Sequence, residues 1–179
     1  MTSGIWLLPG WLNSDASHWQ SRWEAVYGDH RVEQHDWQRP LRGDWLARLE
    51  EELLATSAPV TLVAHSLGCL LVAAWAAHSR NTHKVRAAML VAPGDLERDD
   101  VRQMIPGWAP IVRDPLPFPA IMVAANDDPY CDPARARQMA RDWGARFIDA
   151  GTGGHLNGES GLGDWPEGRK LLTEFLKEH

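Results

Sequence analysis

Ser66 is the residue whose surroundings most clearly suggest chemistry. Segment 60–75 reads VTLVAHSLGCLLVAAW: an apolar run typical of a buried strand, then the serine, then an apolar run typical of a helix. A sharp strand-to-helix turn that exposes a serine hydroxyl is crowded two residues before and two residues after the serine. Ala64 and Gly68 are small enough for both places. The pattern predicts a nucleophile elbow; in the alternative, an ordinary turn, Ser66 only caps the helix.

A base and an orienting acid follow further along the chain. A serine hydroxyl is a weak nucleophile, so it needs a histidine within hydrogen-bonding reach and a carboxylate that orients the histidine. In proteins with such an elbow, the residues of the triad follow one another along the chain in the order Ser, Asp, His. The apolar segment 119–125 predicts a buried strand that ends just before Asp127 and Asp128, and the glycine-rich loop 150–157 carries His155. Glycines allow that loop to place the histidine freely. We therefore predict a catalytic triad.

The loop after the second buried strand offers three aspartates. Asp132 precedes Pro133 and a helical pattern, so we interpret it as an N-cap with proline in the first turn. Many hydrolases place the acid three residues before an apolar residue that turns the loop back. Asp128 with Cys131 fits that spacing, and we favour Asp128 over Asp127 as the acid of the triad.

The remaining histidines are not expected to take part in the chemistry. His65 adjoins the serine, but consecutive side chains at a sharp turn point apart, so we interpret it as structural. The others lie in helical or polar contexts, and we expect solvated side chains for His18, His30, His35, His78, His83 and His179.

Six motifs spread over nearly the whole chain resemble a known family. They are LPGWLNS (8–14), HWQSRWE (18–24), AHSLG (64–68), NDDPY (126–130), GGHLN (153–157) and SGLGDWPEG (160–168). The chain resembles the small serine hydrolases related to the retinoblastoma-binding serine hydrolase, within the α/β-hydrolase superfamily. The resemblance implies a catalytic triad of Ser66, Asp128 and His155. The Leu-x-Cys-x-Glu element of one member is missing, so retinoblastoma binding is not expected.

The elements that must position these residues alternate along the chain. We expect strands at 5–8, 31–33, 60–64, 85–91, 120–124 and 146–148, and helices at 19–26, 44–55, 67–77, 133–143 and 165–177. Such alternation predicts an α/β fold, a three-layer sandwich with helices on both faces of a parallel sheet. At 179 residues, one α/β-hydrolase domain over 1–179 is expected. Right-handed crossovers and the resemblance suggest a reduced α/β-hydrolase fold with six strands in the order 2-1-3-4-5-6.

In that order the first and third strands are neighbours, and ligands bind at such a switch point. We therefore expect the oxyanion hole to use the backbone N–H groups of Leu67 and Trp11, with Gly10 beside them. Segment 93–119 is rich in proline, unlike a regular helix, and too short for a separate cap domain, so we expect a minimal lid over a shallow site. Trp11, Trp108 and Trp165 could form an aromatic pocket, or the ten tryptophans could simply fill the core.

Composition excludes several classes of function. The net charge is −6, and the 18 lysines and arginines are scattered, so nucleic-acid binding is not expected. The two cysteines, Cys69 and Cys131, show no metal-ligand spacing, and we expect reduced thiols. The first residues have no basic region, and their apolar run is too short for a secretion signal or a membrane span. We expect a cytoplasmic enzyme without metal or cofactor and without membrane contact.

These observations favour a serine hydrolase that cleaves small carboxylic esters, with amides and thioesters as alternatives. A second interpretation is a protein-binding module on a hydrolase scaffold, because a fold does not fix a function. A third, a flavodoxin-like nucleotide binder, has the same strand order. It would need a phosphate-binding glycine loop after the first strand, where residues 9–13 read PGWLN instead.

Overall fold

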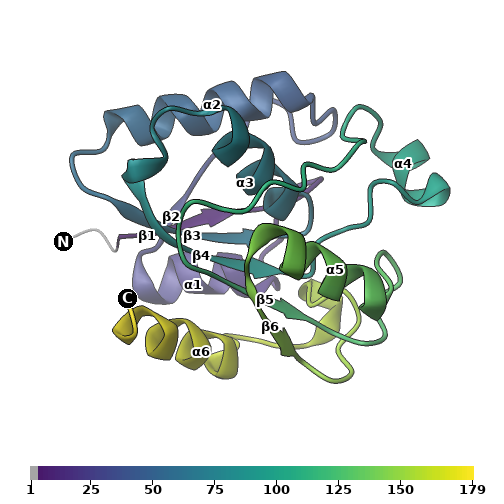
Figure 1. The fold of residues 1–179 in the computed structure, drawn as a ribbon. Coiled ribbons are helices and arrows are strands. Elements are labelled where there is room, and N and C mark those ends of the chain that lie inside the picture. Colours follow the sequence, from purple (N-terminus) through teal and green to yellow (C-terminus); the bar gives the residue numbers. More distant parts are fainter. Residues whose placement is uncertain (1–3) are drawn as a thin grey trace.

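The computed structural model describes residues 4–179 and contains a six-stranded parallel sheet (Figure 1). Its strands are β1 (Ile5–Leu8), β2 (His30–Arg31), β3 (Val60–His65), β4 (Val85–Val91), β5 (Ala120–Ala124) and β6 (Arg146–Asp149). They lie in the order β2-β1-β3-β4-β5-β6, and every neighbouring pair is parallel. The predicted order is confirmed. Because all strands are parallel, their carboxyl ends meet at one edge of the sheet.

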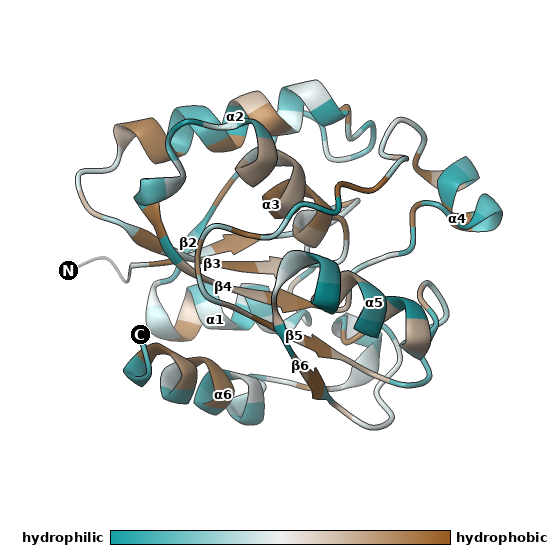
Figure 2. Ribbon diagram, viewed as in Figure 1, coloured by the Kyte–Doolittle hydropathy of each residue, from teal (hydrophilic) through white to brown (hydrophobic). Residues whose placement is uncertain are grey.

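Helices cover both faces of the sheet and complete three layers. Figure 1 shows α1 (Trp19–Tyr27) and α6 (Pro166–Lys177) on one face, and α2 (Arg42–Ala55), α3 (Leu67–His78) and α5 (Pro133–Trp143) on the other. Two short 3-10 helices are Thr82–Lys84 and Gly158–Ser160. A strand that is covered on both faces is apolar over most of its length. Every residue of β3 and β5 is buried, and Figure 2 shows these central strands mainly in the brown of hydrophobic residues. Within residues 4–179, none of the helices has the length and apolar character that a membrane span requires.

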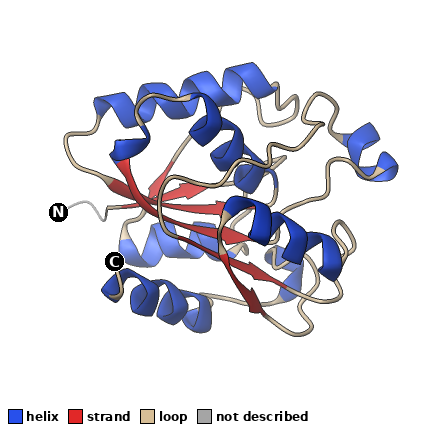
Figure 3. Ribbon diagram, viewed as in Figure 1, coloured by secondary structure: helices blue, strands red, loops and turns tan. Residues whose placement is uncertain are grey.

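The segment between β4 and β5 differs from our expectation. It contains a short helix, α4 (Asp99–Met104), so the prediction of no regular helix there is wrong (Figure 3). Asp99 and Asp100 lie in its first turn, where negative charge favours a helix. It ends at Met104, because the next residue, Ile105, precedes a proline and is therefore disfavoured in helical conformation. The prolines on both sides of α4 suggested irregular structure, although the acidic first turn and the proline after Ile105 are both typical of helix ends.

Two tryptophans that we had placed near the substrate lie in the core. The Trp108 side chain is buried, packs against Trp45 and donates its indole N–H to the backbone oxygen of Pro40 at 2.7 Å. Trp165 is buried as well, with its ring centre 4.9 Å from that of Trp19. Both predictions are wrong. Burying the large apolar area of an indole is favourable, and for Trp108 the core also offers an acceptor for the N–H.

Candidate active site

Ser66 lies at a strained turn between β3 and α3. Its backbone has φ 55° and ψ −119°, a region that residues other than glycine rarely adopt, and its hydroxyl makes no capping bond to the helix. The Ser66 N–H donates to the backbone oxygen of Val91 at 2.9 Å. A Cβ atom at Gly68 would lie only 2.3 Å from the backbone oxygen of Leu8, so this position must be glycine. The geometry is that of a nucleophile elbow. Ser66 occupies the N-cap position of α3, but its side chain does not cap the helix.

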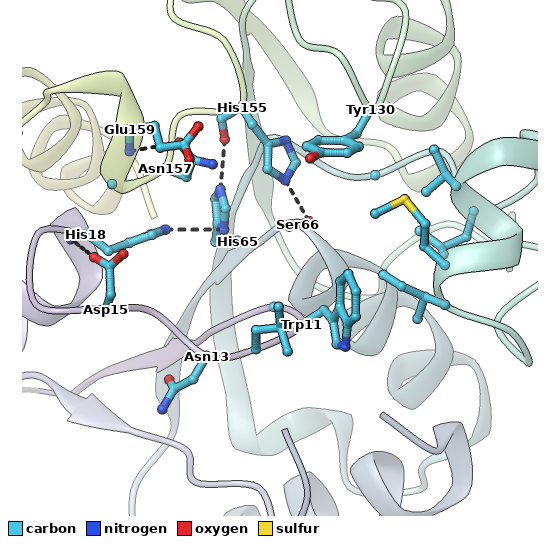
Figure 4. Close-up of a pocket in the computed structure, with 18 residues that line it drawn as sticks. Trp11, Asn13, Asp15, His18, His65, Ser66, Tyr130, His155, Asn157 and Glu159 are labelled. Carbon is cyan, nitrogen blue, oxygen red and sulfur yellow. Dashed lines mark hydrogen bonds between the residues drawn. The ribbon is translucent and has the colours of Figure 1, made fainter. Parts of the chain in front are cut away.

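Three side chains from three strand ends meet at this turn. His155 Nε2 lies 2.8 Å from the Ser66 hydroxyl oxygen (Figure 4). On the other side of the ring, His155 Nδ1 lies 2.9 Å and 3.1 Å from the two carboxylate oxygens of Asp128. The Asp128 side chain is 2% exposed and that of His155 is 10% exposed. The structure therefore brings together the serine, histidine and aspartate that the sequence singled out, in the order needed to pass a proton from the hydroxyl to the ring.

The neighbouring aspartates have other partners. One carboxylate oxygen of Asp127 accepts from the backbone N–H groups of Gly153 and Gly154, each at 2.9 Å. These two hydrogen bonds hold the pKa of Asp127 below its ordinary value. Asp132 is the N-cap residue of α5, as predicted, although its side chain makes no capping bond. Asp127 thus ties down the loop that carries the histidine, while Asp128 contacts the imidazole itself.

The backbone N–H groups of Leu67 and Trp11, predicted for the oxyanion hole, have no acceptor within residues 4–179. Leu67 is the first residue of α3, and the first amides of a helix have no partner within it. Among the described residues, neither the Leu67 nor the Trp11 amide donates a hydrogen bond elsewhere in the chain. The chain passes very close here, since a Cβ atom on Gly10 would lie 3.2 Å from the Leu67 nitrogen. The positions predicted for the oxyanion hole therefore adjoin the serine.

A cavity of about 260 Å³ opens over Ser66, and its two sides differ in chemistry. One side is apolar and comes from the segment after β4 and the loop after β1: Trp11, Leu96, Val101, Met104 and Ile105. The other side is polar and includes Asn13, Asp15, His18, Asn157 and Glu159. Gly10 and Trp11 line the cavity as predicted, whereas Trp108 and Trp165 do not. The apolar residues Val101, Met104 and Ile105 follow helical spacing, a signal that could have identified this wall.

The sequence did not lead us to predict that the aromatic ring of Tyr130 faces His155. Tyr130 lines the cavity, and its ring meets His155 edge-on at 4.8 Å between centres. Its backbone N–H donates to Asp128 at 2.9 Å, so this residue orients the acid as well. Tyr130 lies only two residues after the acid, which places it at the same strand end.

The prediction that His18 is solvated is wrong. Its side chain is 4% exposed, lines the cavity and accepts from the backbone N–H of Gln20 at 3.1 Å at the start of α1. Burial lowers the pKa of His18 to about 4. His65 is also buried, as its structural interpretation required, and burial lowers the pKa of this ring well below its ordinary value. Both rings are therefore neutral at physiological pH.

Buried polar side chains hold the loop that follows β1. The Gln20 amide donates to the backbone oxygen of Val63 at 3.1 Å and accepts from the Ser14 hydroxyl at 2.7 Å. Arg31 donates to the Asn13 side chain at 2.7 Å and to the backbone oxygen of Ser14 at 3.1 Å. The position of the loop that carries the Trp11 amide therefore depends on contacts from α1 and β2.

The two cysteines offer no competing nucleophile. Cys69 and Cys131 are both free and buried. Burial raises the pKa of the Cys131 thiol to about 12 and raises that of Cys69 as well, so neither forms a thiolate near neutral pH. Within residues 4–179, no group of three potential ligands is placed to hold a metal ion.

Comparisons with known proteins identify the family. The model of the serine hydrolase family matches residues 5–174. A protein of Pectobacterium atrosepticum described as a YdeN-like hydrolase is 32% identical; the match covers 96% of this chain and 89% of that one, with a TM-score of 0.82. The ydeN gene product of B. subtilis is 18% identical, with 97% and 98% covered and a TM-score of 0.71. Est1E of Butyrivibrio proteoclasticus, solved with ferulic acid, is 13% identical, with 97% and 86% covered and a TM-score of 0.63.

The last two similarities are similarities of fold, and no curated protein matches the sequence. The family match runs over nearly the whole described chain, and the Pectobacterium structure agrees with it in both sequence and fold. The chain therefore belongs to the serine hydrolase family, and its fold is that of α/β-hydrolases.

Proposed function

We propose that this hydrolase cleaves carboxylic esters of small acyl groups through an acyl-enzyme intermediate on Ser66. The observation that carries the proposal is the continuous set of hydrogen bonds from the Ser66 hydroxyl through His155 to Asp128, at a serine held in a strained turn. A residue in so costly a conformation persists where function requires it.

In the proposed reaction the Ser66 oxygen attacks the acyl carbon while His155 Nε2 takes the hydroxyl proton. Asp128 remains ionised, holds the proton on Nδ1 and stabilises the imidazolium. The N–H groups of Leu67 and Trp11 donate to the negatively charged oxygen of the tetrahedral intermediate. When that intermediate collapses, the ester C–O bond breaks and the alcohol leaves with the proton from His155. A water molecule then repeats both steps, which releases the acid and restores the serine.

The cavity supports a small substrate. Its volume of about 260 Å³ lies below the usual range of roughly 300 to 1,000 Å³ for ligand pockets. The apolar wall at Val101 and Ile105 suits a short hydrocarbon acyl group, and the polar wall suits the alcohol portion. An ester makes a smaller demand on the triad than an amide, because an alcohol is a better leaving group than an amine.

The test is the Ser66→Ala variant, assayed on p-nitrophenyl acetate and butyrate and with a fluorophosphonate probe. We expect a loss of at least roughly 10³-fold in kcat and no labelling, because the covalent step is gone. Ser57→Ala is the matched control, since Ser57 is exposed in the loop before β3, at the opposite edge of the sheet. Retention of more than about a tenth of the wild-type rate in Ser66→Ala would refute the proposal. A wild-type protein that neither turns over esters nor reacts with the probe would favour the protein-binding alternative.

A further inference from the structure

Two buried histidines link the start of α1 to the histidine of the triad. His18 Nε2 lies 3.3 Å from His65 Nδ1, and His65 Nε2 lies 2.9 Å from the backbone oxygen of His155 (Figure 4). The reaction described above uses neither of the two rings. In the close-up both rings lie on the side of His155 away from Tyr130.

The partners of the two rings fix the direction of each hydrogen bond. A carbonyl oxygen only accepts, so His65 Nε2 donates to His155 and His65 Nδ1 is left as an acceptor. The backbone N–H of Gln20 only donates, so His18 accepts on Nδ1 and carries its proton on Nε2, which donates to His65. A proton added to either ring would place two donors face to face. The arrangement therefore requires two neutral imidazoles.

The surroundings of His18 favour its neutral form. Burial is the largest effect that lowers its pKa, and the positive charge of Arg31 acts in the same direction. The carboxylate of Asp15 acts in the opposite direction but is exposed to solvent, and His155 would oppose a second positive charge nearby. The hydrogen bonds that link His18 and His65 to the triad are thus intact at physiological pH.

Helix α1 also holds the backbone carbonyl of Leu156, the residue that follows His155 in the loop. Trp19, the first residue of α1, donates its indole N–H to the backbone oxygen of Leu156 at 2.8 Å. Leu156 has a positive φ of 47°, so the chain here is held in a conformation that it would not adopt alone. On the far side of the loop, Asp127 holds two glycine N–H groups. An irregular, glycine-rich loop needs such external anchors to keep one conformation.

We propose that His18 and His65 are positioning residues for the reaction proposed above: this pair of imidazoles fixes the backbone of His155 and so sets the distance from its ring to Ser66. The inference rests on the proposed function. A displacement of about 1 Å at a reacting group can cost roughly 10²-fold in rate, and the 2.8 Å contact to the serine is the distance at stake.

Two substitutions at His18 separate the link from the helix cap. In His18→Asn the side chain still accepts from the Gln20 N–H, since asparagine is a favoured N-cap, but it is too short to reach His65. In His18→Gln the longer amide can donate to His65, as Nε2 does now, but the cap is weakened. His83→Asn is the matched control, because His83 is exposed and precedes β4 at the opposite edge of the sheet.

We expect His18→Asn to lower kcat roughly 10- to 100-fold, with KM changed by less than about threefold and Tm by less than about 2 °C. His18→Gln should recover kcat to within about fivefold of wild type in spite of a lower Tm. Amide hydrogen exchange in residues 153–156 should be faster in His18→Asn and near wild type in His18→Gln, whatever substrate is used. A purely structural role predicts the reverse, with the larger loss of activity in the variant with the lower Tm.

Two results would overturn the inference: a kcat of His18→Asn within about twofold of wild type, or an unchanged exchange rate in the loop. Failure of the proposed function looks different, because then the wild-type protein itself does not hydrolyse esters or Ser66→Ala keeps the activity. The His83→Asn control should match wild type in kcat, KM, Tm and amide hydrogen exchange.

Discussion

Replacing Asp128 with asparagine tests the part of the triad that sequence reasoning placed least firmly. One carboxylate oxygen of Asp128 accepts from the Tyr130 N–H, and the other lies 2.9 Å from His155 Nδ1. In Asp128→Asn the amide oxygen must keep the place beside Tyr130, because an NH₂ group there would meet another donor. The NH₂ group then faces Nδ1, which must accept. The proton of the imidazole moves to Nε2, where it faces the Ser66 hydroxyl.

The magnitude follows from that wrong tautomer. With a proton already on Nε2, His155 cannot take the proton of Ser66, although the side chains keep nearly the same shape and burial. The equivalent change in a well-studied serine protease triad lowers kcat by roughly 10⁴-fold. We expect a loss of roughly 10³- to 10⁴-fold here, which corresponds to about 4 to 5.5 kcal/mol in the activation free energy.

The assay is kcat for p-nitrophenyl butyrate, with circular dichroism to verify folding. Asp127→Asn is the matched control: its remaining oxygen can still accept from Gly153 and Gly154, so we expect a loss of less than about tenfold. If Asp127→Asn, rather than Asp128→Asn, loses most of its kcat, the acid of the triad has been assigned one residue too late. If neither variant loses more than about tenfold, the orienting acid lies elsewhere and the assignment must be withdrawn.

Two further predictions concern stability. Gly68→Ala should lower the free energy of unfolding by about 1 to 3 kcal/mol in urea titrations, because its Cβ would lie 2.3 Å from a backbone oxygen. Gly43→Ala, in open space on α2, should be neutral or stabilising, and equal losses in both variants would contradict the packing argument. The pKa of His18 is about 4 in the folded protein and about 6.5 in an unfolded chain, so the unfolded state binds the proton first as the pH falls. Stability should therefore be lost between about pH 6.5 and 4, by about 3 kcal/mol from this group. His18→Asn should show a shallower decline, and an identical slope would mean that His18 is not held neutral.

Much of the fold was accessible from the sequence because its signals are local. The bounds of β1, β4 and β5 agree with the expected strands at 5–8, 85–91 and 120–124, and α5 agrees with 133–143. A strand covered on both faces is apolar over most of its length, and such an apolar run can be recognised in the sequence without knowing the neighbouring strands. The short α4 was not predicted because the prolines around it indicate irregular structure, although Val101, Met104 and Ile105 follow helical spacing.

The side chains of the site were accessible for a related reason. Parallel strands end at the same edge of a sheet, so Ser66, Asp128 and His155 could be grouped once each was placed just after a strand. Small residues at the serine turn are a local steric demand, which Gly68 meets against the end of β1. The sequence by itself determined which side chains could meet.

Only the tertiary structure decided which residues are buried around the side chains of the triad. His18 and Trp108 look like surface and rim residues in sequence, yet one supports the loop of the triad histidine and the other fills the core. Their environment is made by residues distant in the chain: His65 lies 47 positions from His18, and Pro40 lies 68 positions from Trp108. Burial and hydrogen bonding depend on such non-local neighbours, which no local pattern specifies.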